Sequence, residues 1–266
     1  MKKFEGKLLV SDMDATLLNS DHKVSERNRE AIEYFISEGG RFTVATGRMV
    51  PAVRAYFSQM RINAPALLHN GAKIYDFEKD KPIFEKFIEE PRKNAIRRVH
   101  DELPEIGLEV YSEEKVYIYR ECSETERFKT RSYDVTYSLP EKVWHKPWIK
   151  ALLIGERELL DKYEPVYRRE YDNGYCVRSG SMYLDVVANG VSKGKALTKL
   201  TELLGIERGN VFAVGDNMND IDMLLAAGNA FAVENAEPAV KAAAGRMVPS
   251  CDESAVAYII EKCMDV

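Results

Sequence analysis

Strand and helix signals alternate at both ends of this chain, and that alternation constrains its fold more than any other feature. The first part carries strand-like segments at 8–10, 41–45 and 66–69, with helix-like segments at 25–37 and 51–59. The last part carries strand-like segments at 210–214 and 230–233, with helix-like segments at 193–204, 220–227, 238–244 and 252–263. Short connections between alternating strands and helices require right-handed crossovers and a parallel sheet. The sequence therefore predicts an α/β fold with a Rossmann-like parallel-sheet core.

The middle of the chain differs in its composition and in its pattern of polar and apolar residues. Residues 83–187 hold both tryptophans and most of the tyrosines. Alternating polar and apolar residues at 108–119, and a hairpin-like segment at 175–187, predict antiparallel strands there. A further strand at 149–154 and a charged amphipathic helix at 157–171 complete the pattern. We expect a smaller α+β domain at 83–187, inserted into a core formed by residues 1–82 and 188–266.

Composition narrows the class of protein. The 266 residues contain 45% hydrophobic and 30% charged side chains, which is typical of a globular chain. A net charge of −5 argues against binding to nucleic acid or to an acidic membrane surface. No apolar run reaches the roughly 20 residues of a membrane span, and the apolar patch after the basic N-terminus is too short for a signal peptide. We expect a cytoplasmic protein. The sequence does not determine its oligomeric state.

The cysteines support the same compartment. Their spacing contains no Cys-x-x-Cys pair and no histidine at metal-ligand spacing, so we expect four free thiols in a reducing environment. They are Cys122, Cys176, Cys251 and Cys263.

Two aspartates, Asp12 and Asp14, follow the first predicted strand directly. In an open parallel sheet, ligands bind at the carboxyl ends of the strands. Two carboxylates this close repel each other and lose hydration if they are partly buried, so a divalent cation would compensate them most simply. The pair taken alone is explained equally well by a turn, because aspartate favours turns for purely local reasons.

Two further segments carry groups that could bind an oxyanion. Thr46-Gly47-Arg48 follows the second strand, and a hydroxyl beside exposed backbone N–H groups suits a phosphate. Thr46 alone is more often a helix cap or a turn residue. Lys193 lies at a predicted helix start, although residues 189–195 lack the spacing and the terminal Ser/Thr of a P-loop. Most lysines in such positions are simply solvated.

The segment Gly215-Asp216-Asn217-Met218-Asn219-Asp220 follows another strand. It places two carboxylates and two amides within six residues, a density of oxygen ligands that a purely structural loop seldom needs. Oxygen ligands of this kind favour Mg²⁺ over Zn²⁺.

Taken in order, these motifs resemble those of the haloacid dehalogenase-like superfamily, and in particular its Cof-type hydrolases, which are Mg²⁺-dependent phosphatases. The resemblance covers nearly the whole chain and places a mobile cap domain of the C2 type at the insert. It rests on Asp12-Met-Asp14-Ala-Thr-Leu17, Thr46-Gly47-Arg48, Asn70-Gly71-Ala72, Lys193-Gly194 and Gly215-Asp216-Asn-Met-Asn219-Asp220, with Met223-Leu224, Ala227-Gly228, Asn235-Ala236 and Ala255-Val256 near the end.

The resemblance implies a role for each matching residue. Asp12 would be the nucleophile that forms an aspartyl-phosphate. Asp14 would protonate the leaving alkoxide and then activate water. Lys193 would neutralise charge on the phosphoryl group in flight. Thr46 and the amide of Gly47 would hold phosphoryl oxygens, with Arg48 as an additional candidate facing the pocket.

The resemblance also implies a magnesium site. The carboxylates of Asp12 and Asp216 would bind Mg²⁺ with help from the Asp14 carbonyl. Asp220 would orient the lysine or bind the metal through water. Asn219 would contact the phosphate or the water shell of the metal, and Met13 would contribute only its backbone amide.

One residue departs from the family pattern, because Ala15 replaces the usual glycine after the second aspartate. A positive φ at this position would cost about 1 kcal/mol for an L-residue. We expect a negative φ, which makes the alanine harmless.

The function expected from this resemblance is a Mg²⁺-dependent phosphomonoesterase acting on a small phosphorylated metabolite, in particular a sugar phosphate. Phosphomutase-type phosphoryl transfer is one alternative, although mutases of the superfamily carry helical caps. A catalytically weak ligand-binding relative is the other, with Ala15 as its sequence support. The resemblance implies that the cap contacts the leaving group. Any single candidate for this contact could instead belong to the core or the surface of the cap. The polar and aromatic candidates are Tyr111, Tyr117, His145, Trp148, Arg178 and Tyr183.

Overall fold

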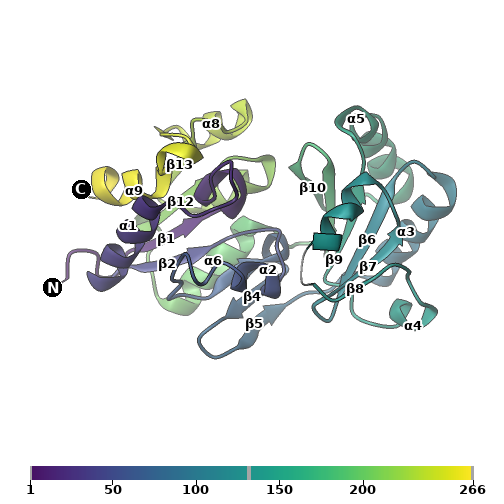
Figure 1. Ribbon diagram of the computed structural model, residues 1–266, viewed down its shortest axis with the longest axis horizontal. Coiled ribbons are helices and arrows are strands. Elements are labelled where there is room, and N and C mark those ends of the chain that lie inside the picture. The colour runs from purple at the N-terminus through teal and green to yellow at the C-terminus, as the bar shows by residue number, and fades with distance from the viewer. Residues whose placement is uncertain (1, 131–132, 265–266) are drawn as a thin grey trace. The chain divides into compact units, whose positions relative to one another are not determined.

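The structure is a computed structural model that describes residues 2–130 and 133–264 (Figure 1). The chain divides into two compact units. The core unit comprises Met1–Phe84 and Ser192–Val266, and the insert unit comprises Glu85–Val191. Within the described residues, every helix is too short or too polar to cross a membrane.

The core unit is built on a parallel sheet of five strands in the order β14-β13-β12-β1-β2. These strands are β1 (Leu8–Ser11), β2 (Arg41–Val44), β12 (Val211–Gly215), β13 (Asn229–Val233) and β14 (Met247–Val248). All four residues of β1 are buried, because helices cover both faces of a parallel sheet and leave no solvated side. The predicted α/β class with a parallel-sheet core is confirmed.

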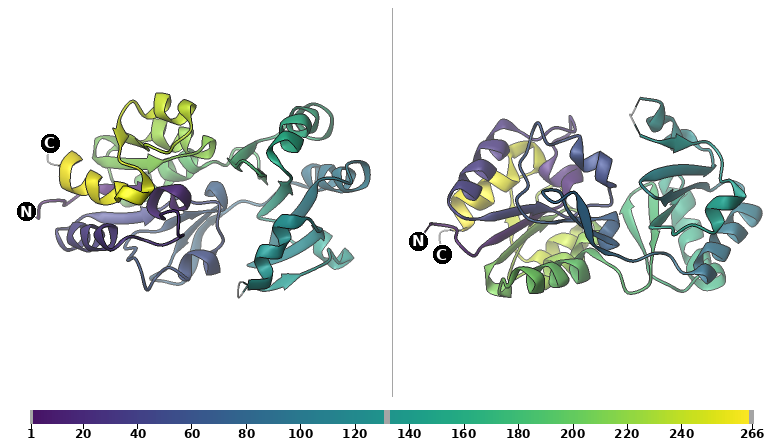
Figure 2. Two further views of the ribbon diagram at one scale, coloured as in Figure 1. Left: turned by 45° about the horizontal axis from the view of Figure 1, so that its top comes forward. Right: turned by 90° about the horizontal axis from the view of Figure 1, so that it is seen from below.

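Helices pack on both faces of this sheet (Figure 2). One face carries α1 (Glu26–Ser37) and α9 (Ala255–Tyr258), which contact each other. The other carries α6 (Lys193–Leu204) and α7 (Ile221–Ala226). The bounds predicted for α6 and for α8 (Pro238–Ala244) agree with the structure. Ser25 caps α1, since its Oγ accepts a hydrogen bond of 3.2 Å from the Asn28 backbone N–H.

The third predicted strand lies outside the main sheet, which corrects the expectation of a continuous parallel sheet. β3 (Ala66–Leu68) pairs antiparallel with β4 (Lys73–Asp76), and β5 (Lys81–Glu85) completes a small three-stranded sheet. A single parallel bridge between Ala45 and Leu67 connects β3 with the end of β2.

Two predicted helices are interrupted. The segment 51–59 forms only the short α2 (Val50–Arg54), after which Tyr56 and Phe57 donate to carbonyls three residues back and tighten the chain into turns. The segment 252–263 breaks at Ser254, which has a φ of 63°. The helix starts again as α9 and continues as a wider turn at Ile259–Cys263.

The insert unit has its own sheet of six strands in the order β10-β11-β9-β6-β7-β8. The antiparallel pairs β6–β7 and β10–β11 confirm the strands predicted at 108–119 and the hairpin at 175–187. The strands are β6 (Gly107–Ser112), β7 (Lys115–Arg120), β8 (Val135–Thr136), β9 (Lys150–Ile154), β10 (Cys176–Gly180) and β11 (Tyr183–Val187).

Helices α3 (Glu90–Glu102) and α5 (Arg157–Val166) supply Ile96, Val99 and Leu160 to a separate hydrophobic core behind this sheet. The predicted helix 157–171 ends its α-helical part at Val166 and continues as a π-helical turn through Tyr171. The short α4 (Glu141–Trp144) and the 3₁₀ turns at Ser123–Thr130 complete the unit.

All four cysteines are free thiols, as expected.

Candidate active site

The carboxyl ends of three neighbouring strands meet at one edge of the core sheet. β1 pairs with β2 on one side and with β12 on the other, and Ser11 is aligned with Val44 and with Val214. The Asp12 backbone N–H continues the ladder with a 2.9 Å hydrogen bond to the Val214 carbonyl. This register gathers the residues that follow the strands, namely Asp12, Thr46 and Asp216.

Among the described residues, Lys193 is the only buried cation that joins carboxylates at this edge of the sheet. Its Nζ lies 2.5 Å from Asp12 Oδ1 and 2.6 Å from Asp220 Oδ1, and only 1% of the residue is exposed. The lysine opens α6, whose first turn is capped by Ser192 Oγ accepting from the Lys195 N–H. The alternative of a solvated lysine at a helix start is therefore excluded.

Three buried carboxylates surround this single ammonium group. Asp12, Asp216 and Asp220 each offer an oxygen, and these oxygens all lie within 4.8 Å of one another. Thr16 Oγ1 donates a 2.9 Å hydrogen bond to Asp216 Oδ1 and orients that side chain. One positive charge cannot balance three carboxylates, and buried uncompensated charge is costly. An all-oxygen donor set with excess negative charge fits a hard divalent cation such as Mg²⁺.

The protonation of the cluster reflects this imbalance. Burial raises the pKa of Asp12 well above its ordinary value, although Lys193 opposes the shift. Burial and the charge of Asp220 raise the pKa of Asp216 to about 7. Burial would lower the pKa of Lys193, but the two facing carboxylates outweigh it and raise that pKa. A divalent cation bound here would lower the pKa of both Asp12 and Asp216.

Asp14 has a different environment from the other three aspartates. Its carboxylate is half exposed and forms a bidentate pair with Arg48, with distances of 2.8 Å and 2.5 Å. Partial desolvation works to raise the pKa of Asp14, but the hydrogen bonds and charge of Arg48 outweigh it and lower that pKa. The Arg48 guanidinium also lies 5.1 Å from the ring centroid of Tyr56. Two residues apart in sequence, Asp12 and Asp14 thus have opposite pKa shifts.

The expectation for Ala15 is wrong, because its φ is +55° and its ψ is 17°. The chain reverses in a tight turn over Met13–Leu17, closed by the Leu18 N–H donating to the Met13 carbonyl at 2.8 Å. Asn235 Nδ2 donates to the Ala15 carbonyl at 2.8 Å and holds the turn from outside. These contacts keep the alanine in a left-handed conformation that costs about 1 kcal/mol.

Thr46 and the residues after it form a buried turn. The Thr46 N–H donates to the Leu67 carbonyl at 2.8 Å, and Thr46 Oγ1 accepts from the Arg48 N–H at 3.2 Å. Asn219 lies in the loop that also carries Asp216, and its Nδ2 donates to Asn70 Oδ1 at 3.0 Å. The Met13 side chain is buried in the hydrophobic core, which leaves only its backbone available to a ligand.

Two residues of the site, Thr16 and Asn70, have no role in the predictions made from the sequence. Thr16 binds Asp216, and Asn70 binds Asn219, in each case across more than a hundred residues of chain. Both residues belong to the quoted motifs, which is the signal that could have pointed to them. Their partners depend on how distant segments pack together, which the spacing of residues in the sequence does not show.

The insert candidates differ in their surroundings. Trp148 and Tyr117 are buried in the hydrophobic core of the insert unit. Arg178 pairs with Asp161 and Glu164. Separately, Tyr111 donates to Glu109, Tyr183 donates to Glu124, and His145 is exposed.

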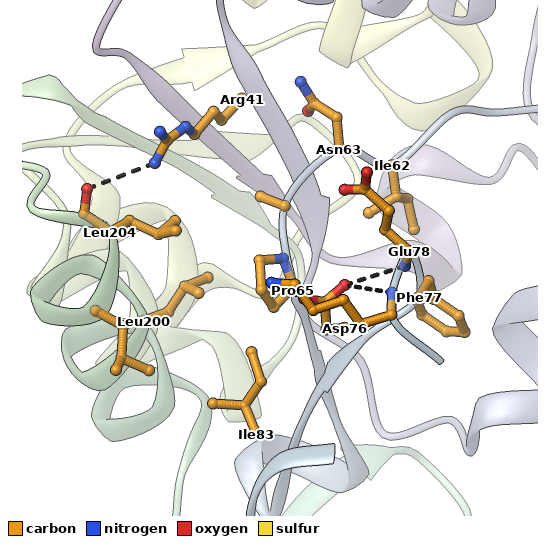
Figure 3. Close-up of a pocket in the computed structure, with 13 residues that line it drawn as sticks. Arg41, Ile62, Asn63, Pro65, Asp76, Phe77, Glu78, Ile83, Leu200 and Leu204 are labelled. Carbon is orange, nitrogen blue, oxygen red and sulfur yellow. Dashed lines mark hydrogen bonds and ion pairs between the residues drawn. The ribbon is translucent and has the colours of Figure 1, made fainter. Parts of the chain in front are cut away.

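A cavity of about 400 Å³ lies elsewhere in the core unit (Figure 3). It is formed by the start of β2, the segment before β3, the end of β4 and the last turns of α6, where Arg41, Pro65, Asp76 and Leu204 line it. None of the residues of the acidic cluster lines this cavity. Cavity volume alone therefore does not mark the candidate active site.

Comparison with known proteins finds relatives along almost the whole chain. The model of the haloacid dehalogenase-like hydrolase family matches residues 9–260. A Streptococcus pyogenes protein whose name assigns it provisionally to the phosphatases is 26% identical, covering 96% of this chain and 97% of its own. A Bacillus subtilis 5-amino-6-(5-phospho-D-ribitylamino)uracil phosphatase is 27% identical, covering 96% and 94%. The crystal structure of a haloacid dehalogenase-like hydrolase from Bacteroides thetaiotaomicron is 26% identical, with a TM-score of 0.80 over 97% of this chain and 99% of that chain.

Proposed function

The chain belongs to the haloacid dehalogenase-like hydrolases and is a phosphatase of that family, and from this premise we propose a specific reaction. The enzyme hydrolyses a small phosphorylated metabolite, in particular a sugar phosphate, with Mg²⁺ and an aspartyl-phosphate intermediate. The observation that carries the proposal is the buried Lys193 held between Asp12 and Asp220 beside Asp216. The substrate class is supported by the phosphorylated ribityl group in the name of the Bacillus subtilis relative.

Asp12 is the proposed nucleophile. The lysine binds one of its carboxylate oxygens at 2.5 Å, which positions the other oxygen for attack on phosphorus. The attack forms an acyl-phosphate bond to Asp12 and breaks the bond from phosphorus to the leaving oxygen. Lys193, which is itself buried, compensates negative charge on the phosphoryl oxygens during this transfer.

Asp216 and Asp12 are the proposed carboxylate ligands of Mg²⁺, with the backbone carbonyl of Asp14 as a third. Bound there, Mg²⁺ would supply positive charge to the transferring phosphoryl group. Asp220 is better placed to orient Lys193 than to bind metal, because both of its oxygens are occupied. Its Oδ1 accepts from the lysine, and its Oδ2 accepts from the backbone N–H groups of Asp216 and Asn217.

Asp14 is the proposed general acid and base. In its protonated form it gives a proton to the leaving alkoxide, and the resulting carboxylate then takes a proton from the water that hydrolyses the aspartyl-phosphate. The Arg48 pair favours the ionised form, which suits the second step and opposes the first. We therefore propose that Arg48 leaves Asp14 and contacts the anionic substrate when the substrate binds.

The remaining phosphoryl contacts are proposed for Thr46, the Gly47 and Met13 backbone N–H groups, and Asn219. Backbone N–H groups and a hydroxyl at strand ends are suited to an anion. We propose that the insert unit acts as the cap and selects the leaving group. Its mixed α+β structure is not the helical cap expected for a phosphomutase, so hydrolysis is the preferred reaction.

Release of inorganic phosphate from p-nitrophenyl phosphate tests this function. Turnover is expected with Mg²⁺, and none with EDTA or in Asp12→Asn. Asp134→Asn, at an exposed aspartate of the insert unit that pairs with Lys115, is the matched control and keeps full activity. Absence of turnover with Mg²⁺, or an active Asp12→Asn enzyme, would refute the proposal. A panel of hexose, pentose and nucleoside phosphates then identifies the substrate class.

A further inference from the structure

Asn70 is a buried motif residue to which the proposed reaction assigns no task. It follows β3 in the sequence Asn70-Gly71-Ala72, is 1% exposed and has a φ of +55°. Its backbone N–H donates to the Thr46 carbonyl at 3.0 Å. The residue is therefore attached directly to the turn that is proposed to hold phosphate.

The side chain of Asn70 connects two loops of the core unit. Its Oδ1 accepts the 3.0 Å hydrogen bond from Asn219 Nδ2, in the loop of Asp216 and Asp220. The amide also packs against Gly47, where a Cβ would lie 3.3 Å from Asn70 Oδ1 and 3.4 Å from Asn70 Nδ2. Asn70 thus lies between the Thr46-Gly47 turn and Asn219, which are both proposed to bind the phosphoryl group.

Two polar groups of this arrangement have no hydrogen-bond partner, and the donor is the one that concerns an anion. Asn70 Nδ2 is buried and has no hydrogen-bond partner among the described residues, and Asn219 Oδ1 shares this condition. Buried side-chain donors in native proteins are nearly always satisfied, so an exception calls for an explanation. The dianion of a phosphomonoester offers only acceptor oxygens, which an amide N–H₂ group complements as a donor.

We propose that Asn70 is an additional ligand of the phosphoryl group. Its Nδ2 donates a hydrogen bond to a phosphoryl oxygen held at the Thr46-Gly47 turn, while its Oδ1 keeps Asn219 directed at the same group. The proposal rests on the proposed phosphatase function of this site. The competing explanation is structural, because asparagine is one of the few residues that tolerate a positive φ.

Direct binding of inorganic phosphate to the Mg²⁺-loaded full-length protein, measured by titration calorimetry, separates the two explanations. Asn70→Asp keeps the shape, the tolerance of positive φ and the acceptor for Asn219, but it replaces the donor by an oxygen and adds a negative charge, and both changes disfavour a phosphoryl oxygen at this atom. Asn70→Gly keeps the backbone conformation and removes the side chain. Asp80→Asn is the control, since Asp80 also has a positive φ, of 51°, and is exposed in the β4–β5 turn.

We expect the phosphate dissociation constant to rise about 10- to 100-fold in both Asn70 variants, the usual effect of losing a hydrogen bond to a charged group. The KM for p-nitrophenyl phosphate rises in parallel, and the control variant binds phosphate like the wild type. Unchanged phosphate affinity in Asn70→Asp would overturn the proposal and leave Asn70 as a structural residue. If Asn70→Asp fails to fold, unchanged phosphate affinity in Asn70→Gly overturns the proposal in the same way.

This outcome is distinguishable from failure of the proposed function. A wild-type protein that binds phosphate through Asn70 but hydrolyses no phosphomonoester would refute the phosphatase and keep the Asn70 site. An active wild type whose Asn70 variants bind phosphate normally would refute only the Asn70 site. A wild type that binds no phosphate at all refutes the Asn70 proposal directly.

Discussion

Asp12, Asp14 and Asp216 are the same residue type, yet their surroundings give them different protonation. Burial raises the pKa of Asp12 and of Asp216, whereas Arg48 lowers that of Asp14. The proposed nucleophile and metal ligand must be ionised and the proposed proton donor must be protonated, so these shifts run opposite to what the proposed roles need. A bound divalent cation would lower the pKa of Asp12 and Asp216, and release of Arg48 would raise that of Asp14. The difference arises from partners that lie far away in the sequence.

The raised pKa of Asp216 predicts a pH-dependent stability. The pKa of Asp216 is about 7 in the folded protein, and its ordinary value is 3.8. The folded state therefore binds this proton more tightly than the unfolded state, and the resulting stabilisation is fully present below about pH 4. That stabilisation is lost as the pH rises through 7. We expect the free energy of unfolding in EDTA, measured in urea, to fall between pH 5.5 and 8. Mg²⁺ restores it, because the cation favours the ionised carboxylate.

Asp216→Asn is the control for this pH dependence. The substitution removes the titrating carboxyl, so the fall between pH 5.5 and 8 becomes smaller and Mg²⁺ no longer reverses it. Stability in EDTA that rises over this interval in the wild type would contradict the assignment.

The left-handed Ala15 predicts a stabilising substitution. Ala15→Gly removes the steric cost of a positive φ but adds freedom to the unfolded chain, so we expect the free energy of unfolding to rise by up to about 1 kcal/mol. Ala242→Gly, at an exposed position in α8, is expected to have the opposite sign and to cost about 0.5–1 kcal/mol. Urea unfolding of both variants checks this, and two losses of stability would show that Ala15 is not strained.

At the scale of elements, the N-terminal caps of two helices contribute to stability, and one of them also positions a residue of the proposed active site. Ser25 caps α1 and Ser192 caps α6, each through a side-chain oxygen that accepts a backbone N–H three residues on. The first residue of α6 is Lys193, so the cap of this helix also determines where the ammonium group lies. The first turn of α1 supplies no residue to the acidic cluster.

The two caps therefore predict separable effects. Ser25→Ala and Ser192→Ala are each expected to lower the free energy of unfolding by about 1 kcal/mol. Only Ser192→Ala is expected to lower kcat, since it loosens the turn that positions Lys193. Urea unfolding and steady-state kinetics on p-nitrophenyl phosphate measure both quantities. Equal kcat values in the two variants would mean that the ion pairs with Asp12 and Asp220 hold the lysine without the cap.

At the scale of the whole molecule, two hydrophobic cores share no residue. The core unit holds the acidic cluster, and the insert unit holds both tryptophans, Trp144 and Trp148. Units with separate cores can unfold separately, and a ligand stabilises only the unit that binds it. Intrinsic tryptophan fluorescence therefore reports on the insert unit alone.

This separation predicts two thermal transitions with different responses to Mg²⁺. In calorimetry we expect Mg²⁺ to raise the transition of the core unit relative to EDTA. The transition followed by tryptophan fluorescence should stay within about a degree, because RT ln(1 + [L]/Kd) applies only to the binding unit. Asp216→Asn should lose the Mg²⁺ response. A fluorescence transition that shifts together with the calorimetric one would show that the units unfold as one.

Local patterns in the sequence were enough to place most elements. The helix predicted at 193–204 is α6 at the same bounds, and alternation in the middle of the chain predicts β6 and β7. The predictions failed where distant contacts override local preference. β3 leaves the main sheet for its hairpin partner β4, and Ser254 interrupts the last helix.

The sequence by itself determined which groups this protein has for phosphoryl chemistry and where along the chain they stand. It did so because strand ends and helix starts are local features that short motifs encode. Only the tertiary structure decided which groups meet. Parallel register aligns three strand ends that are far apart in the chain, and the pairs Thr16–Asp216 and Arg48–Asp14 follow from it. The packing of α6 brings Lys193 to Asp12, and the turn between β3 and β4 brings Asn70 to Asn219. The positive φ of Ala15 has the same origin, since contacts from Asn235 and the closing turn hold it in place.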